Sequence, residues 1–255
     1  MNKTLKEAWI IGKNEILIQM KNPLWLFFGL FQPIVYLTLF SPFLSGIAKA
    51  PGFPAESAIQ FFVPGLLIMN ILFGASFAGF GLINQLRSGY IERIRVTPVS
   101  RLAIVIGLVI RAPVVVLVQS FILVLTAMIF FGFHASFWGM HLEVLLMILI
   151  GLTMASVSYT IALIAKDEGT LAAITNFFTL PLMILSGIML PVAFAPKIIQ
   201  HISAIDPLRY AVDASRALVS GNVGDNAVAI SFVLFALLAA LALAWFIRSM
   251  KDAVS

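Results

Sequence analysis

The side chains best suited to act on a partner lie in one short basic segment that separates two apolar stretches. This segment runs from Gln85 to Arg101 and carries one glutamate and four arginines: Glu92, Arg87, Arg93, Arg95 and Arg101. Each charge placed in hydrocarbon costs at least about 2.5 kcal/mol, so the segment must lie at a membrane surface. Charged side chains exposed there can bind a soluble protein, and the segment is therefore a candidate docking element.

The docking segment has the pattern of a short helix. Gly89 permits a turn, the residues from Tyr90 to Val96 suffice for about two helical turns, and Pro98 ends the helix because the residue before a proline is disfavoured in the α region. Glu92 and Arg95 lie one turn apart, so the polar side is solvated. A loop that only fixes the membrane topology is the alternative. The residues assigned to docking are Gly89, Tyr90, Glu92, Arg93, Arg95, Thr97, Pro98 and Arg101.

A second polar pattern lies nearer the carboxyl terminus. Asp206 followed by Pro207 is typical of a helix start, with an acceptor at the cap and a proline at the first helical position. Gly221 ends this helix. The helix has a polar and an apolar stripe on opposite faces, formed by Arg209, Asp213, Arg216 and Ser220 and by Leu208, Val212, Ser215 and Leu218. Ion pairs at these spacings are ordinary on a helix surface, so the polar stripe is interpreted as structural.

Catalytic residues do not form a recognisable site in the sequence. The histidines are interpreted as lone interfacial side chains: His134, His141 and His201. The sequence contains no His-Glu-x-x-His zinc motif, no Gly-x-Ser-x-Gly nucleophile motif and no Gly-x-x-x-x-Gly-Lys-Ser/Thr phosphate-binding loop. We therefore expect no catalytic residue, metal or cofactor in this chain, and no ATP hydrolysis that depends on such a loop.

The elements that hold these residues are membrane helices. Of 255 residues, 61% are hydrophobic and 11% are charged, which lies outside the range of a soluble domain of that size. About 20 apolar residues are needed for each spanning helix. The sequence predicts an all-α polytopic membrane protein with six spans: 24–44, 61–83, 114–133, 142–165, 171–190 and 227–247. No connection is long enough for a separate folded domain, so residues 1–255 form one domain.

The distribution of positive charge predicts the orientation in the membrane. With the amino terminus in the cytoplasm, twelve of the sixteen lysines and arginines lie on the inner side, and four lie outside: Lys49, Lys197, Arg209 and Arg216. Such a split over short loops is a strong positive-inside signal, and six spans return the carboxyl terminus to the cytoplasm. The net charge of +5 follows from this topology and is not evidence for a nucleic-acid partner.

The amino-terminal segment, residues 1–23, is predicted to be a helix lying in the inner membrane interface. Leu5, Trp9, Ile16 and Met20 are spaced by four and seven residues along one side, and lysines gather on the other side. An irregular cytoplasmic tail is the alternative. The second span has a face of small residues on which another helix can approach closely, or behind which a cavity can open; this face is made by Gly65, Gly74, Gly79 and Gly81.

The apolar stretch after Arg101 is too long for one span. As a helix it would extend about 48 Å, whereas the bilayer core is about 30 Å thick. The sequence predicts a break at Arg111-Ala-Pro113 and a separate lead-in helix over Leu102 to Ile110. Arg111 would then extend toward the headgroups. A role for Arg111 in gating or substrate binding is the alternative.

Three stretches resemble the membrane subunit of type-2 ATP-binding-cassette exporters, the permease family that includes drug-resistance, lipid and polysaccharide export systems. They are Tyr90-Ile-Glu-Arg-Ile-Arg-Val-Thr-Pro-Val-Ser-Arg101, Leu185-Ser-Gly-Ile-Met-Leu-Pro191 and Asp206-Pro-Leu-Arg-Tyr-Ala-Val-Asp-Ala-Ser-Arg216. The resemblance covers essentially the whole chain and is closest to the drug-exporter permeases. The third stretch is the most specific.

The resemblance implies a function for each segment. Residues 1–23 would be an interface helix, residues 87–101 a cytoplasmic coupling helix between spans two and three, and residues 191–226 two short outer re-entrant helices. The docking residues would then couple to an ATPase, and the outer gate would comprise Gly187, Pro191, Pro207, Tyr210 and Arg216. A homodimer or a pair of permeases in a bacterial plasma or inner membrane would work with two ATPase subunits that bind ATP and magnesium. The implied activity is export of a hydrophobic drug, a lipid or a glycan-type substrate.

Two other classes of protein remain open at this point. A secondary transporter or channel would need no ATPase, but the two three-span halves show no internal repeat and no buried acid is evident for ion coupling. Glu143 lies near the start of its predicted span. A membrane-embedded enzyme would need a catalytic constellation that the sequence lacks.

Overall fold

The computed structural model describes residues 3–21, 23–47, 55–89, 93 and 99–254. This described part of the chain is helical and contains no strand. Its elements are α1 (Lys3–Met20), α2 (Pro23–Ile47), α3 (Ala58–Ser76), α4 (Gly79–Arg87), α6 (Arg101–Phe131), α7 (Phe137–Ala165), α8 (Glu168–Leu185), η1 (Val192–Phe194), α9 (Lys197–Ser203), α10 (Pro207–Val219) and α11 (Asn226–Val254).

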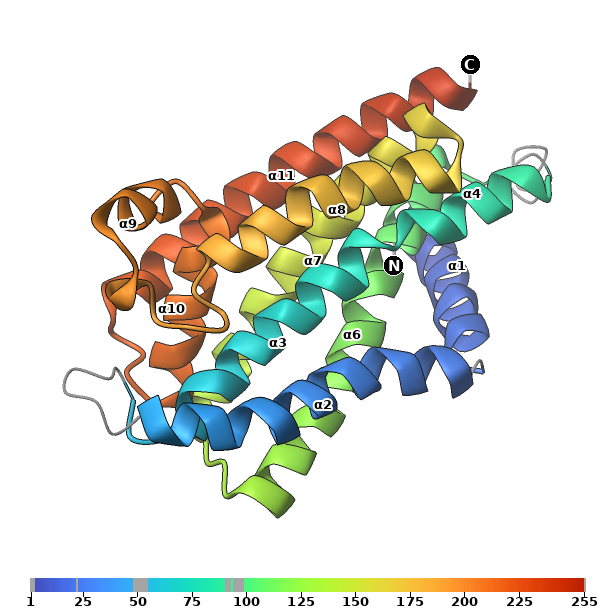
Figure 1. Ribbon diagram of the computed structural model, residues 1–255. Helices are drawn as coiled ribbons and strands as arrows, with labels where there is room; N and C mark the ends of the chain where they lie inside the picture. The colour runs from blue at the N-terminus through green and yellow to red at the C-terminus, as the bar shows by residue number, and fades with distance from the viewer. Residues whose placement is uncertain (1–2, 22, 48–54, 90–92, 94–98, 255) are drawn as a thin grey trace.

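The long helices lie side by side, and the two ends of the molecule differ (Figure 1). α9 and α10 lie at one end, whereas α1, the end of α4 and the carboxyl terminus lie at the other. Within the described residues, five helical segments are long and apolar enough to cross a membrane: Ala58–Arg87, Leu102–Phe131, Phe137–Ala165, Glu168–Leu185 and Asn226–Lys251. The prediction of an all-helical membrane protein is therefore confirmed.

Two predicted spans differ from the helices observed. The first predicted span falls in α2, a helix of 25 residues, within which Gly29–Phe40 is a shorter apolar helix among the described residues. A sixth span thus stays a prediction. The fifth predicted span extends to residue 190, but α8 ends at Leu185. Gly187 then turns the chain with a φ of 77°, a left-handed conformation that glycine adopts without steric cost.

The second span is interrupted, although its sequence is apolar throughout. α3 ends at Ser76 and α4 begins at Gly79. Between them the Ala78 N–H donates to the Ala75 carbonyl at 3.1 Å, and the Gly81 N–H donates to the Ala78 carbonyl at 3.2 Å. Bonds of this i→i−3 kind tighten the chain into a turn. We call the interruption between Ser76 and Gly79 the break.

The predicted close packing of the second span is confirmed. A Cβ atom added at Gly65, Gly74, Gly79 or Gly81 would lie 2.4 to 2.7 Å from an atom of a neighbouring segment. At Gly65 that atom is the carbonyl oxygen of Ile188. Glycine at this position therefore lets α3 contact the turn that follows α8.

α6 is one continuous helix, so the predicted break at Arg111-Ala-Pro113 is wrong. Pro113 lies inside the helix and packs against Gly151 of α7, where an added Cβ would lie 2.9 Å from the Pro113 Cβ. Neighbouring helices make such a proline tolerable within a span. Arg111 does not extend to the surface, because its side chain is 11% exposed and pairs with Glu15 of α1 at 3.1 Å.

The buried apolar side chains form two clusters, one toward each end of the molecule. The α10-side cluster includes Phe62, Leu66, Ile71, Leu123, Ile150, Val212 and Phe235. The α1-side cluster includes Leu82, Val105, Leu108, Tyr159, Leu171, Phe246 and Met250. α6, α7 and α11 contribute to both clusters, whereas α3 packs mainly in the first and α4 in the second. The break therefore lies where the two clusters meet.

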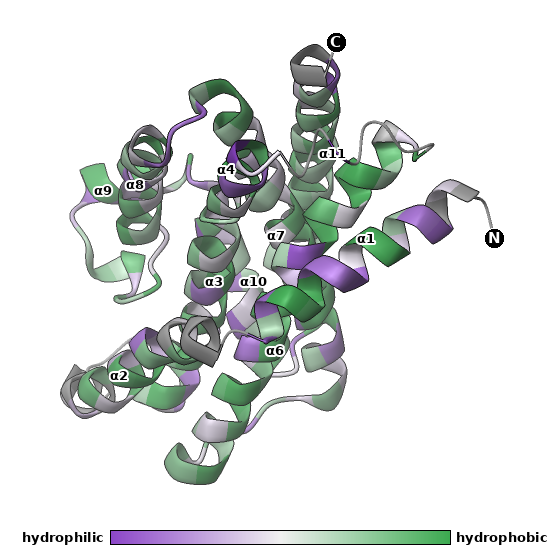
Figure 2. Cartoon of the chain, turned by 90° about the vertical axis from the view of Figure 1, so that its right-hand side faces the viewer, coloured by the Kyte–Doolittle hydropathy of each residue, from purple (hydrophilic) through white to green (hydrophobic). Residues whose placement is uncertain are grey.

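The predicted amino-terminal helix is present as α1, and the side that packs on the protein is distinct from the predicted apolar stripe. Ala8 and Glu15 are 2% and 3% exposed, whereas Trp9 is 61% exposed. Small residues make the contact with α6, since a Cβ at Gly12 would lie 3.3 Å from the Gly107 carbonyl oxygen. Figure 2 shows α1 lying across this end of the molecule with hydrophilic and hydrophobic residues interleaved along it. Its position in a membrane interface stays a prediction.

Candidate functional site

α10 begins as its sequence predicts. The Asp206 side chain accepts a hydrogen bond from the Leu208 backbone N–H at 2.9 Å, and Pro207 is the first helical residue. After the last helical residue, Val219, the chain turns at Gly221 with a φ of 86°. The predicted apolar stripe is buried: Leu208, Val212, Ser215 and Leu218. These contacts fix which side of α10 faces outward.

Arg216, on the other side of α10, connects three elements. Its Nη2 donates to the Gly187 carbonyl at 2.7 Å, and its Nε donates to the Phe61 carbonyl at 3.3 Å. The guanidinium carbon also lies 3.6 Å from the centre of the Phe61 ring, a favourable cation–π contact. Arg216 thus joins α10 to the first turn of α3 and to the turn after α8.

The other candidate gate residues lie near Arg216 but do not all contact it. Pro191 precedes η1 and lines the same cavity as Arg216. The Tyr210 hydroxyl donates to the Ala204 carbonyl at 3.0 Å, which ties α10 to the end of α9. The structure therefore places Gly187 and Pro191 with Arg216, whereas Pro207 and Tyr210 fix the start of α10.

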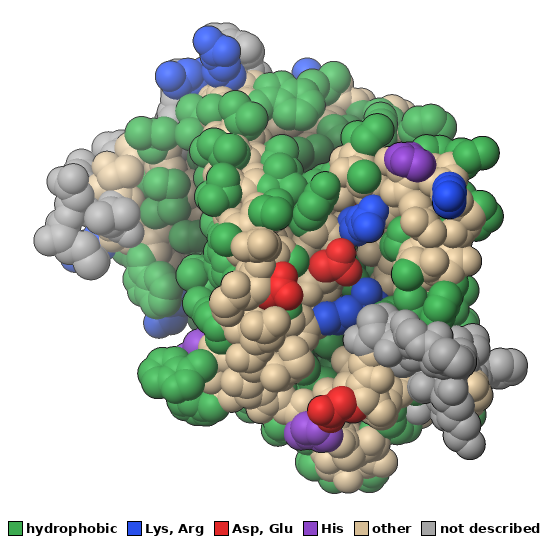
Figure 3. Space-filling view, turned by 90° about the vertical axis from the view of Figure 1, so that its left-hand side faces the viewer, with side chains coloured by type: hydrophobic (Ala, Val, Ile, Leu, Met, Phe, Trp, Pro, Cys, Tyr) green, Lys and Arg blue, Asp and Glu red, His purple; other side chains and the backbone are tan. Residues whose placement is uncertain are grey.

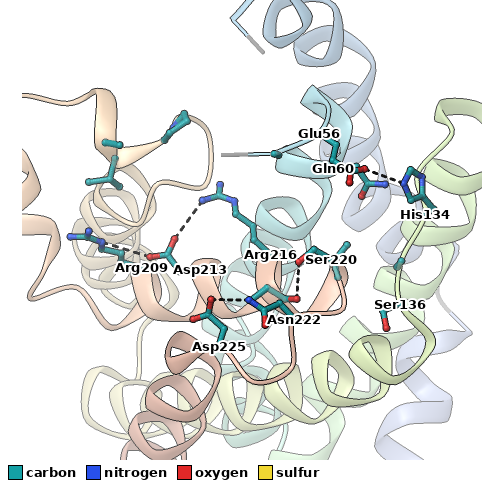
Figure 4. A pocket seen from close by; sticks show the side chains of 17 residues that line it. Glu56, Gln60, His134, Ser136, Arg209, Asp213, Arg216, Ser220, Asn222 and Asp225 are labelled. Carbon is teal, nitrogen blue, oxygen red and sulfur yellow. Dashed lines mark hydrogen bonds and ion pairs between the residues drawn. The ribbon is translucent and has the colours of Figure 1, made fainter. Parts of the chain in front are cut away.

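A cavity of about 820 Å³ opens at this end of the molecule. The first turn of α3, the loop before α7, η1, α10 and the loop before α11 form its walls. Figure 3 shows acidic and basic side chains gathered around a hollow, and Figure 4 shows Arg216 and Asp213 side by side in the cavity wall. Its polar lining residues are Glu56, Gln60, His134, Ser136, Arg209, Asp213, Arg216, Ser220, Asn222 and Asp225.

The charged side chains of α10 that line this cavity are paired with one another. Asp213 lies 3.7 Å from Arg216 and 3.9 Å from Arg209, as the sequence predicts for the polar stripe. On the opposite wall, Glu56 lies 3.7 Å from His134. Paired charges of both signs stabilise the walls and leave a polar space open to water.

Burial shifts the pKa values of two groups on α10, Arg216 and Asp213, and of its N-cap residue, Asp206. Desolvation lowers the pKa of Arg216 to about 10, which leaves it charged at neutral pH. Desolvation raises the pKa of Asp213, and the charges of Arg216 and Arg209 oppose that rise. Desolvation also raises the pKa of Asp206 to about 6, against the hydrogen bond from Leu208. The Asp206 Oδ2 atom is buried without a hydrogen-bond partner, which is the physical reason for its shift.

Glu143, placed from the sequence near the start of its span, is fully buried in α7, which the sequence does not predict. The Ser215 hydroxyl donates to its Oε1 at 2.7 Å, and its Oε2 is buried without a hydrogen-bond partner. A glutamate near the beginning of a span is expected to reach the surface, but here α10 covers it. The signal that could have found it is Ser215, a polar residue on the otherwise apolar stripe of α10.

Only part of the docking segment lies within the described residues. Gly89 adopts a φ of 67°, which confirms the predicted turn. Arg93 donates to the carbonyls of Ser88 and Gly89 at 3.1 and 3.4 Å, and Arg101 begins α6. Tyr90, Glu92, Arg95, Thr97 and Pro98 lie outside the described residues, and their docking role stays a prediction.

The long apolar helices define the class of protein only broadly, as a polytopic helical membrane protein. Comparisons with known proteins are more specific. The ABC-2 type transporter family matches residues 6–219. The chain belongs to this family, and the resemblance predicted from the three sequence stretches is confirmed. The protein is thus the membrane subunit of a transporter in which a permease pairs with an ATPase subunit.

Individual relatives agree with this assignment. The putative transport permease ycf38 of Cyanophora paradoxa is 25% identical over 218 residues, which cover 85% of this chain and 75% of the relative. The ycf38 protein of Porphyra purpurea is 25% identical over 236 residues, covering 88% and 80%. The daunorubicin resistance ABC transporter permease protein DrrB1 of Streptomyces coeruleorubidus is 24% identical over 199 residues, covering 76% and 68%.

The cap of α10 yields a prediction about stability and pH. Folding raises the pKa of the Asp206 carboxyl from 3.8 to about 6, so the folded state favours the protonated form. The stabilisation from this protonation is complete at a pH below the pKa of the unfolded chain and is lost as the pH rises through the pKa of the folded protein. Asp206→Asn keeps an acceptor for the Leu208 N–H and removes the ionisation. The variant should therefore gain stability over wild type as pH rises from about 4 to about 7, by up to about 3 kcal/mol.

Thermal unfolding of the detergent-solubilised protein across this pH range measures the difference. Asp225→Asn is the matched control, because Asp225 accepts from the Ala227 N–H at 2.8 Å at the start of α11 and is only partly buried. Equal pH dependence of wild type and Asp206→Asn would contradict the prediction.

Proposed function

We propose that this chain is the membrane subunit of an ATP-driven exporter. The exporter would move a hydrophobic drug, a lipid or a glycan-type substrate out of the cytoplasm or the inner leaflet. The observation that carries the proposal is the family match over residues 6–219, which includes the docking segment and α10. Among these cargoes, the similarity to DrrB1, a daunorubicin resistance permease, favours a hydrophobic drug.

The proposed assembly contains two ATPase subunits and either two copies of this chain or a pair of related permeases. ATP and magnesium bind in the ATPase subunits. In this proposal α2 supplies the sixth span, α9 and α10 re-enter the membrane from the outside, and both termini lie in the cytoplasm of a bacterial cell. The positive-inside charge distribution supports this orientation.

The proposed mechanism is alternating access. Binding of ATP draws the ATPase subunits together, the docking segment moves with them, and the spans rearrange until the substrate is released outward. ATP can bias such an equilibrium only through contacts that differ between the two states. At the outer end, the bonds from Arg216 to Gly187 and Phe61 hold three elements together, which supports a gate there.

One observation bears on the alternative of ion-coupled secondary transport, although the family assignment already pairs this chain with an ATPase subunit. No buried acid is evident in the sequence for ion coupling, yet Glu143 is fully buried in the structure. Transport by vesicles that contain this chain alone, driven by a proton gradient and abolished by Glu143→Gln, would support this alternative. Transport that requires both the ATPase subunit and ATP would exclude it.

The proposed orientation predicts which surface positions a reagent can reach. Glu56, His201 and Asn222 are exposed near the α10 end, and Ser88 is exposed at the end of α4. The chain has no native cysteine, so single cysteines can be introduced without background. Cysteines at the first three positions should react with an impermeant thiol reagent added outside intact cells, whereas a cysteine at Ser88 should react only after lysis. The reverse pattern would overturn the orientation.

The proposed docking role predicts a variant that assembles in the membrane but transports poorly. Glu92→Ala with Arg95→Ala removes two charges from a surface segment, so the free energy of unfolding should change by no more than about 0.5 kcal/mol for each. Loss of charged anchors at an interface can cost about 2 kcal/mol or more in binding. The double variant should therefore bind the ATPase subunit weakly, or export nothing while ATP is still hydrolysed.

Copurification of the ATPase and coupled transport are the measurements. Lys197→Ala is the control, because it removes an exposed charge at the other end of the molecule. Normal export by the double variant at normal expression would leave the segment as a loop that only fixes topology.

A further inference from the structure

The break in the second span leaves backbone N–H and carbonyl groups without partners inside a helix. Side chains of other helices form hydrogen bonds with them. Ser158 of α7 bridges the gap, since its hydroxyl donates to the Ser76 carbonyl at 2.6 Å and accepts from the Gly79 N–H at 2.9 Å. From α6, the Arg111 Nη2 donates to the Ala78 carbonyl at 3.1 Å. Two side chains from two different helices therefore hold the break.

Arg111 also connects the break to α1. Its Nη1 lies 3.1 Å from the Glu15 Oε2 atom, which accepts a further hydrogen bond from the Gln85 side chain at 2.8 Å. Its Nη2 donates to the Tyr159 hydroxyl at 3.2 Å, and that hydroxyl donates to the Leu108 carbonyl at 3.0 Å. Glu15 and Arg111 are 3% and 11% exposed and Tyr159 is fully buried, so water and salt screen these contacts little.

α1 contacts both ends of the docking segment. Glu15 holds Gln85 at the beginning of the segment. Glu7 holds its other end, because the Ser100 N–H donates to the Glu7 carboxylate at 3.1 Å. Ser100 is also the N-cap of α6. A displacement of the docking segment must therefore move α1 with it or break these bonds.

The surroundings of the break leave space for movement. A cavity of about 430 Å³ lies between α1, α4 and α6, and Gly74, Phe77, Gly81, Arg111 and Gln119 are among its lining residues. Because α3 and α4 are separate helices, the angle between them can change without the loss of an i→i−4 bond inside either helix. Changes of this kind at element ends are a common form of hinge motion.

We infer that Arg111 is a positioning residue that couples α1 to the break, so that a displacement of the docking segment changes the angle between α3 and α4. The inference rests on the proposed ATP-driven function, which supplies the displacement. A planar guanidinium can donate to Glu15, Ala78 and Tyr159 at the same time, whereas the point charge of a lysine cannot reproduce this geometry. Ser158 joins the break to α7 and lies outside this path.

A distance measurement across the break tests the inference in the full transporter, with the ATPase subunits bound. Spin labels at Glu56→Cys, beside the start of α3, and at Ser88→Cys, after α4, report the distance with and without trapped ATP. Labelled copies are diluted with unlabelled ones so that each complex carries one pair. Arg111→Lys and Glu15→Gln should each reduce the population that responds to ATP by about fivefold or more, while ATP hydrolysis continues.

Two further variants separate coupling from simple stability. Arg248→Lys is the matched control, because Arg248 is an exposed arginine near the carboxyl end of α11 and lies outside the docking segment, and its response to ATP should be unchanged. Ser158→Ala loosens the break from α7 but leaves the path from α1, so the response should persist. A purely structural network would instead make Ser158→Ala behave like Arg111→Lys.

The possible results are distinct. An undiminished response in Arg111→Lys and Glu15→Gln would overturn the inference, as would equal losses in Arg111→Lys and Ser158→Ala. If Arg111→Lys does not assemble with the ATPase, Glu15→Gln decides, because it leaves the bonds from Arg111 to Ala78 and Tyr159 in place. A wild-type complex that shows no response to ATP would contradict the proposed function itself, and the inference with it, before any substitution is made.

Discussion

Hydrocarbon offers no hydrogen bonds, so each backbone group freed by the interruption of a spanning helix must find a partner within the protein. The second span of this permease is interrupted between Ser76 and Gly79, and the structure around it follows from that constraint. Ser158 and Arg111 supply the missing bonds. Arg111 is a cation, so its burial requires an anion, and α1 brings Glu15 to it.

The same requirement is met in a different way at the α10 end. Arg216 is also a largely buried cation, and it bonds the carbonyls of Gly187 and Phe61 while pairing with Asp213. Both arginines thus join segments that are distant in sequence but adjacent in the fold. At one end the joined segments line a cavity, and at the other they lie beside the surface proposed to bind an ATPase.

Much of the helical arrangement could be predicted from the sequence, because local signals specify it. The cap at Asp206, the turn at Gly89 and the small-residue face of the second span each depend on a few neighbouring residues. The sequence predicts an interruption at Arg111-Ala-Pro113 of α6, because the apolar stretch is long and contains a proline and a charge, whereas the observed break in the second span depends on tertiary bonds from Ser158 and Arg111. The burial of Glu143 could not be predicted for the same reason, since α10, which is distant in sequence, covers it. The packing position of α1 could not be predicted from its own sequence either, because it depends on the close contact of Gly12 with Gly107 of α6.

The division of the apolar core into two clusters bears on the cooperativity of unfolding. A protein opens locally in units whose free energies lie below that of global unfolding, and such units tend to coincide with separately packed regions. The α10-side and α1-side clusters are linked by α6, α7 and α11, but not by a continuous helix through the second span. We therefore expect the amide hydrogens of α4 and those of α3 to exchange through different opening units, even though the two helices are adjacent in sequence and form one apolar crossing.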